Sequence, residues 1–298
     1  MRDPFFGLTR SSGSGTLVVV GIPWDLTSSY RRGAFAAPNA IRRATDGALY
    51  NRYSERGMDL ADVWRVCDHG NVRKVTAASK LRKSIEVTTK LHNHGNQRTL
   101  FLGGDHYVTS PAFELIAESE GKPLSLLYFD AHPDLYPSYE GNLYSHATVV
   151  SRIVENPNTS TGRVCYLGIR ASTSEQDRRI EKFGLTKITC DDICRKGCEA
   201  ISSSVKALLT DDRVYLSIDL DCLDPAYAPG VANPQPGGLS TRQLFDILHG
   251  LDGLQVVAAD IVEYSPNCES MARTTAFTAA VLIKEIMQLL DSARRSAA

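Results

Sequence analysis

Short apolar segments recur along this chain between longer amphipathic stretches, and this alternation limits the possible folds more than any other feature of the sequence. Continuous runs of Val, Leu and Ile are typical of strands buried on both faces of a parallel sheet. Apolar residues at helical spacing indicate helices between those strands. We expect strands at 16–21, 98–103, 124–130, 163–170, 213–221 and 254–263, and helices at 37–51, 77–92, 147–155, 200–209, 241–248 and 274–290.

This order of segments predicts an α/β fold around a mainly parallel sheet. Right-handed crossovers would place helices on both faces, and ligands would gather beyond the carboxyl ends of the strands. We find no internal repeat and no linker rich in Pro, Gly or Ser that would divide the chain. We therefore expect a loose leader over residues 1–15 and a single domain over residues 16–298.

Charge and cysteine usage exclude several classes of function. The 298 residues carry a formal net charge of -1, so no broad basic surface is available for nucleic acid or an anionic membrane. No apolar run approaches the ~18 residues needed to span a bilayer. The seven cysteines are scattered and odd in number, which indicates a reducing cytoplasm rather than a disulfide framework. Cys190, Cys194 and Cys198 recur every four residues, which fits a helix face better than a metal site.

Acidic and histidine residues follow three of the expected strands, as GGDH at 103–106, DAHPD at 130–134 and DLD at 219–221. A single Asp after a strand is usually a helix cap, and a single His is usually a satisfied polar residue. Four carboxylates at one edge of a sheet would instead repel each other strongly in a partly dry site. A cationic centre has to neutralise them.

Two divalent ions would supply the matching positive charge. Oxygen ligands with two imidazoles suit manganese better than structural zinc, which prefers thiolates. Two metals about 3.5–4 Å apart can share a water, lower its pKa and direct it at an electrophilic carbon. The candidate ligands are His106, Asp130, His132, Asp134, Asp219 and Asp221.

Five ordered motifs resemble the signatures of the ureohydrolase family of arginases and agmatinases: GGDH at 103–106, DAHPD at 130–134, SHAT at 145–148, SIDLDCLDPAYAPG at 217–230 and DIVEYSP at 260–266. The resemblance covers the chain from Gly21 to the last expected helix and favours agmatinase-like members. It implies a three-layer α/β/α sandwich, two Mn²⁺ ions, and hydrolysis of a small guanidino substrate to urea and an amine. It also implies a homo-oligomer, either a trimer or a hexamer.

The resemblance implies how the two ions would be held. Asp130 and Asp219 would bridge them, and a hydroxide between the ions would attack the guanidinium carbon. The first ion would be held by His106, Asp130, Asp134 and Asp219, and the second by His132, Asp130, Asp219 and Asp221.

The resemblance also implies roles in catalysis and substrate binding. His146 would shuttle a proton to the leaving amine, and Asp134 would pass on the proton of the attacking hydroxide. Glu263 would accept a bidentate interaction from the guanidinium. Tyr136 stands where arginases carry an asparagine that helps to hold a carboxylate, which weakens free arginine as the substrate.

Agmatine is the leading substrate because it has no α-carboxylate to anchor. Guanidinobutyrate would need a cationic partner such as Arg170 or Arg31, and an arginine side chain within a peptide would need an open mouth. Tyr136, Tyr139 and Tyr144 would either line that mouth or simply pack within their loop. Two other functions remain open, a single-zinc deacetylase on the same fold and a non-catalytic binding protein, and the complete ligand set argues against both.

Overall fold

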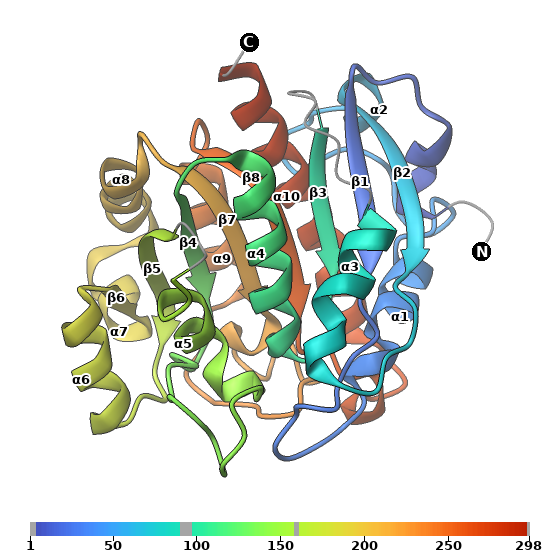
Figure 1. Cartoon of the computed structure of the whole chain (residues 1–298). Helices are drawn as coiled ribbons and strands as arrows, with labels where there is room; N and C mark the ends of the chain where they lie inside the picture. Colours follow the sequence, from blue (N-terminus) through green and yellow to red (C-terminus); the bar gives the residue numbers. More distant parts are fainter. Residues whose placement is uncertain (1–3, 90–96, 158–160, 297–298) are drawn as a thin grey trace.

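A computed structural model describes residues 4–89, 97–157 and 161–296 (Figure 1). Its centre is an eight-stranded sheet in the order β2-β1-β3-β8-β7-β4-β5-β6. Every neighbouring pair of strands is parallel. The strands are β1 Gly15–Gly21, β2 Trp64–Asn71, β3 Gln97–Leu102, β4 Leu124–Phe129, β5 Thr161–Ile169, β6 Thr186–Thr189, β7 Arg213–Asp219 and β8 Gln255–Val262.

Helices cover both faces of the sheet, and the predicted three-layer α/β/α fold is confirmed. In Figure 1, α3, α4 and α5 lie in front of the sheet, and α9 and α10 lie behind it. Two separate groups of buried apolar side chains fill the two interfaces. The helices are α1 Ala37–Ala44, α2 Leu60–Val63, α3 Leu81–Thr89, α4 Thr109–Glu120, α5 Val149–Val154, α6 Ser174–Phe183, α7 Cys190–Lys196, α8 Cys198–Leu209, α9 Thr241–Gly250 and α10 Thr274–Ser296.

The two edge strands, β2 and β6, were not predicted. Only Trp64 and Val66 of β2 are buried, and all four residues of β6 are half-buried. An edge strand has only one neighbour, so its sequence does not need the continuous apolar run that marked the central strands. Two predicted helices are also shorter, since α1 ends at Ala44 and the segment before Leu81 is a short 3-10 turn. Residues 90–92 of the predicted helix 77–92 lie outside the described residues.

The prediction of a loose leader over residues 1–15 is wrong for its described part. Residues Phe5–Arg10 form a 3-10 segment in which the side chains of Phe5, Phe6 and Leu8 are buried in the core. The amide of Phe5 donates to Thr45 Oγ1 at 3.1 Å. Burial of these three large apolar side chains stabilises the segment and offsets the conformational entropy that is lost when it is ordered.

The order of the strands in the sheet determines where the site lies. Strands β3, β8, β7 and β4 are neighbours in the middle of the sheet, although they come from distant parts of the sequence. Each is followed at its carboxyl end by one of the acidic motifs. Parallel strands end at a common edge, so the sheet brings these motifs together at the place where α/β folds bind ligands.

Candidate metal centre

All the predicted ligands meet at the carboxyl edge of the central strands. His106 follows β3, the segment 130–134 follows β4, and Asp219 ends β7. Four of the side chains are almost wholly buried, with exposures of 0% for Asp130, 1% for His106 and 3% for both Asp219 and Asp221. The structure therefore brings together the residues that the sequence singled out, from three strands.

Three carboxylates surround one nitrogen of His106. Its Nδ1 lies 3.0 Å from Asp130 Oδ2, 3.1 Å from Asp219 Oδ2 and 3.5 Å from Asp134 Oδ2. The hydroxyl of Tyr128 is also 3.1 Å from this nitrogen. One imidazole nitrogen can carry only one hydrogen, so it cannot satisfy all of these oxygens at once.

A second group of ligating atoms surrounds His132, which is half-buried. Its Nδ1 lies 3.0 Å from Asp221 Oδ2 and 3.4 Å from Asp130 Oδ1. Asp130 thus contributes one oxygen to each histidine. Asp130 therefore has the position expected of a residue shared between two cation sites.

Tight turns orient the carboxylates of Asp130 and Asp219. The amide of His132 donates to Asp130 Oδ1 at 2.6 Å, and the amide of Asp221 donates to Asp219 Oδ1 at 2.6 Å. These aspartates do not point from within extended strands, because β4 ends at Phe129 and β7 ends at Asp219. Each Asp instead caps the turn that follows its strand, which leaves its second oxygen directed into the cluster.

Burial and mutual repulsion disturb the protonation of the cluster. Burial, with the charge of Asp130 second, raises the pKa of Asp134 to about 7. Burial and the neighbouring Asp221 raise the pKa of Asp219 well above its usual value. Burial opposes the charged form of His132, but Asp221 and Asp130 outweigh it and raise its pKa to about 12. Without a cation, the cluster therefore holds protons to reduce its negative charge.

These residues fit a pair of divalent cations. Asp130 Oδ2 is buried and accepts no hydrogen bond from the described residues, although His106 Nδ1 faces it. Two sets of ligating atoms lie close enough to surround an ion, His106 with Asp130 and Asp134, and Asp130 with His132 and Asp221. A cation at each set would satisfy the converging oxygens that a single proton cannot.

His106 is oriented by Ser217, Asp260 and Tyr128, none of which was among the predicted site residues. Its Nε2 lies 2.9 Å from Ser217 Oγ, which donates to Asp260 Oδ1 at 2.7 Å. Its ring stacks on Tyr128 with centroids 4.5 Å apart. These contacts turn Nδ1 toward the carboxylates, as outer partners commonly do for a metal-ligating histidine. Ser217 lies two residues before Asp219 in the same strand, so the two side chains point to the same face of the sheet.

Glu263 and His146 lie beside the cluster and contact each other. Nδ1 of His146 is 3.1 Å from Glu263 Oε1, and the same oxygen accepts a hydrogen bond from the amide of His106 at 2.8 Å. Burial opposes the charged form of His146, but the Glu263 carboxylate outweighs it and raises the pKa of His146 to about 9. Glu263 Oε2 is buried and accepts no hydrogen bond from the described residues.

The backbone of Glu263 is in the left-handed region, with a φ of 62°. This conformation is costly for a residue with a side chain and persists where surrounding contacts enforce it. Here the amide of Glu263 donates to Gly104 O at 2.9 Å, which ties the end of β8 to the turn after β3. The strained turn directs the carboxylate back toward His106 and His146.

A cavity of about 540 Å³ opens onto the cluster. Asp134, Asp219, His146 and Glu263 form part of its wall. Its described lining is otherwise mostly polar or aromatic and consists of Ser29, Tyr30, Arg31, His132, Tyr136, Tyr139, Ala147, Ala171, Gln176, Asp221, Asn233, Pro234 and Gln235.

The residues expected to contact a substrate are only partly brought to this cavity. Tyr136 lines it and donates from its hydroxyl to Thr173 Oγ1 at 3.2 Å. Tyr144 is not among the described lining residues and packs instead against Tyr107. Arg170 is also not among them, because its guanidinium donates to backbone carbonyls, including those of Asp221 and Gln235 at 2.6 Å each.

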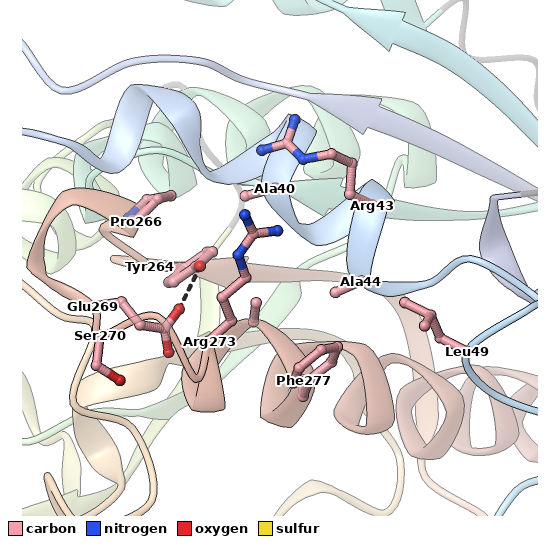
Figure 2. A pocket seen from close by; sticks show the side chains of 11 residues that line it. Ala40, Arg43, Ala44, Leu49, Tyr264, Pro266, Glu269, Ser270, Arg273 and Phe277 are labelled. Carbon is pink, nitrogen blue, oxygen red and sulfur yellow. Dashed lines mark hydrogen bonds between the residues drawn. The ribbon is translucent and has the colours of Figure 1, made fainter. Parts of the chain in front are cut away.

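A second cavity, of about 180 Å³, lies between α1 and the start of α10 (Figure 2). Arg43 and Arg273 reach into the same region, and the hydroxyl of Tyr264 donates to Glu269 at 2.6 Å. None of its described lining residues also lines the cavity over the cluster. Its walls carry a single carboxylate, so it lacks the converging ligands of the metal centre.

The row of three cysteines does not form a metal site or a single helix face. Cys190 begins α7 and Cys198 begins α8, and Gly197 separates the two helices with a φ of 80°. The Cys190 thiol donates to Gly168 O at 3.1 Å. Among the described residues, no candidate metal-binding group contains a cysteine.

Within the described part of the chain, no helix combines the length and apolarity that crossing a bilayer requires.

Known proteins resemble the chain over almost its whole length. A sequence model described as the arginase family matches residues 15–288. A mitochondrial arginase 1 of Oryza sativa subsp. indica is 35% identical over 90% of this chain and 79% of its own length. A guanidinopropionase of Pseudomonas aeruginosa is 32% identical over 94% of this chain and 88% of its own. The crystal structure of a hypothetical agmatinase from Burkholderia thailandensis superposes with a TM-score of 0.83 and 29% identity over 99% and 92% of the two chains.

Proposed function

Because the chain belongs to the arginase family of binuclear metal hydrolases, which act on amidino carbon–nitrogen bonds, we propose that it is a manganese ureohydrolase that releases urea from a small guanidino substrate. The observation that carries this proposal is the cluster of four aspartates and two histidines, part of which lies in the wall of a cavity together with Glu263 and His146. A protein that only binds a ligand would not need a metal cluster that generates a nucleophile, nor an imidazole beside it that can carry a proton.

The proposed ligands are those derived from the sequence, with Asp130 and Asp219 bridging. When bound, two divalent ions lower the pKa of a shared water and so supply a nucleophile at neutral pH. Asp130 supports the bridging role because its two oxygens face different histidines. The oxygen-rich set with two imidazoles favours manganese over zinc.

The remaining roles belong to side chains on the cavity wall. Glu263 has one oxygen fixed by the amide of His106 and a second that accepts no hydrogen bond from the described residues, which leaves that oxygen available to a guanidinium. His146 lies 3.1 Å from the first oxygen, so its ring would be near the leaving amine of a guanidinium bound by Glu263. Asp134, which lines the same cavity as His146, would pass a proton between the attacking water and the leaving amine.

Agmatine remains the leading substrate in this proposal. The cavity wall offers Tyr136 and Tyr139, whose rings lie 5.5 Å apart, as aromatic faces for a cationic or extended tail. Guanidinobutyrate is the second candidate, and Arg31 is the cation that would receive its carboxylate, since Arg170 is held by backbone carbonyls. Free arginine and a peptide arginine rank lower.

The deacetylase alternative is less well supported by the geometry. A single zinc with an Asp, a His and a second Asp would leave the His106, Asp130 and Asp134 group without a cation. That group would then hold converging carboxylates in a buried place with only protons to neutralise them.

A urea-release assay tests the function. The full chain would be reconstituted with Mn²⁺ and given agmatine, guanidinobutyrate, guanidinopropionate, free arginine and an arginine-containing peptide. Agmatine should give the highest kcat/KM, and urea and the amine should appear in equal amounts. Absence of urea with every compound, at about two bound ions per chain, would refute the proposal.

We further propose a cytoplasmic location and a homo-oligomer, either a trimer or a hexamer. The cysteine usage supports the first, although the rice relative is named as mitochondrial. Light scattering of the purified chain would measure the stoichiometry.

A further inference from the structure

The loop after β1 contacts the proposed proton shuttle. Ser29 lines the cavity over the metal centre, and its Oγ lies 2.8 Å from His146 Nε2. The amide of Ser29 points at the same nitrogen from 3.2 Å. Two atoms of one residue therefore meet one nitrogen of the imidazole, 117 positions away in the sequence.

This loop is fixed by several hydrogen bonds. Asp105, which is fully buried in the turn after β3, accepts from the amide of Thr27 at 3.0 Å and from its hydroxyl at 2.7 Å. The indole of Trp24 donates to Thr27 Oγ1 at 2.7 Å. The carbonyl of Thr27 accepts from the amide of His146 at 3.3 Å. Ser29 therefore extends from a rigid anchor that is also bonded to the backbone of the histidine.

The contacts of Ser29 distinguish the two nitrogens of His146. A backbone amide can only donate, so Nε2 has to be the nitrogen without a hydrogen. The hydrogen of the neutral ring then lies on Nδ1, which donates to Glu263 Oε1 at 3.1 Å. The hydroxyl of Ser29 can donate to Nε2 as well. Each nitrogen thus has a partner that suits one tautomer.

We propose that Ser29 is a positioning residue that holds the His146 ring in the Nδ1–H tautomer and leaves Nε2 as the nitrogen that accepts and releases the shuttled proton. This role rests on the proposed function. Nδ1 is committed to Glu263, so a proton that arrives on the ring enters at Nε2, beside a hydroxyl that lines the cavity. The same proton leaves from Nε2 to the departing nitrogen, and the ring returns to its starting form. Asp105 and Thr27 act indirectly, by fixing the loop.

The tautomer can be measured without catalysis. The full chain would be labelled with ¹⁵N-histidine, loaded with Mg²⁺, which is diamagnetic, and studied above the His146 pKa of about 9, where the ring is neutral. The His146 signals would be assigned by their loss in His146→Asn. Long-range proton–nitrogen correlations distinguish the two ring nitrogens. We expect a protonated Nδ1 and an unprotonated Nε2. Ser29→Ala keeps the backbone amide, so the tautomer should persist, and loss of the hydroxyl contact should shift the Nε2 signal.

Kinetics of matched variants provide the second readout. Ser29→Ala should lower kcat roughly 3- to 10-fold, the size expected for one lost hydrogen bond, and leave KM within about twofold. Ser29→Thr keeps the hydroxyl and should recover most of kcat. Ser28→Ala is the control, because the Ser28 hydroxyl donates to Asp105 at 3.2 Å and Ser28 does not line the cavity.

Several outcomes would overturn the proposal. They are an Nε2–H tautomer in the unmodified chain, a Ser29→Ala variant with the kinetics of Ser28→Ala, or a Ser29→Thr variant no better than Ser29→Ala. If the unmodified chain releases no urea from any guanidino compound, the proposed function fails, and the tautomer measurement still decides whether Ser29 orients the ring.

Discussion

At the scale of single residues, the aspartates proposed to bind the metal ions are distinct from the histidine proposed to carry a proton. Asp130 faces both His106 and His132, and Asp219 faces His106. Both aspartates are buried, whereas His146 lies on the cavity wall and contacts no aspartate oxygen in any described hydrogen bond or ion pair. Loss of a shared ligand and loss of a shuttle should therefore give different defects.

Replacing Asp219 by Asn and His146 by Asn should separate the two roles. Asp219→Asn should weaken metal binding by at least about 10- to 100-fold, because removal of even an outer partner of a metal ligand has that effect. His146→Asn should keep about two metals per chain and lower kcat by roughly 100- to 10,000-fold, the range for general acid–base catalysis. Metal analysis after gel filtration and steady-state kinetics measure the two effects. Equal metal loss in both variants would contradict the assigned roles.

The ligands could be predicted because each follows a strand at the edge where parallel strands end together. Ser29, Asp105 and Ser217 could not be assigned a role in the same way. A serine or an aspartate in a loop or strand has many ordinary uses, and the partners of these residues lie far away in the sequence, 111 positions in the case of Ser217 and His106. Their roles depend on which side chains the fold places opposite them.

At the scale of elements, the central strands could be predicted from the sequence, but the edge strands and the amino-terminal 3-10 segment could not. Strands β3, β4, β7 and β8 are buried on both faces, so their apolar runs are continuous. The edge strands and the segment Phe5–Arg10 are stabilised by one neighbour or by a few side chains. Such contacts leave a weaker pattern in the sequence than burial on two faces.

The amino-terminal segment provides a test of this scale. Phe5→Ala should lower the unfolding free energy by about 3–5 kcal/mol, because the side chain is fully buried and its removal leaves a cavity. Phe35→Ala is the matched control, since Phe35 is 52% exposed and should change stability by less than about 0.5 kcal/mol. Urea unfolding followed by tryptophan fluorescence measures both. Equal stabilities would mean that residues 5–10 do not pack as the structure has them.

At the scale of the whole molecule, metal binding should be linked to pH-dependent stability. Burial, with Glu263 second, raises the pKa of Asp105 to about 7, and burial and Asp130 do the same for Asp134. An unfolded Asp titrates near ~3.9. Between about pH 4 and pH 7 the folded metal-free chain therefore holds more protons than the unfolded chain, so its stability falls as the pH rises. His132 acts in the same direction, from the ordinary histidine value up to about 12.

Bound manganese should replace those protons, so its stabilising effect should grow with pH. We expect the increase in Tm on adding Mn²⁺ to be several degrees larger at pH 7.5 than at pH 5.5. Calorimetry with Mn²⁺ or with a chelator at both pH values measures it. Asp134→Asn should flatten the pH dependence of the metal-free protein, and an equal Tm gain at both pH values would contradict the linkage.

The position of β8 has a consequence for how the chain matures. This last strand lies between β3 and β7 and supplies the hydrogen-bonded connection between them. Until residues 255–262 leave the ribosome, His106 belongs to one half of an unfinished sheet, and Asp130 and Asp219 belong to the other. A nascent chain therefore cannot assemble the complete metal centre until β8 has been synthesised.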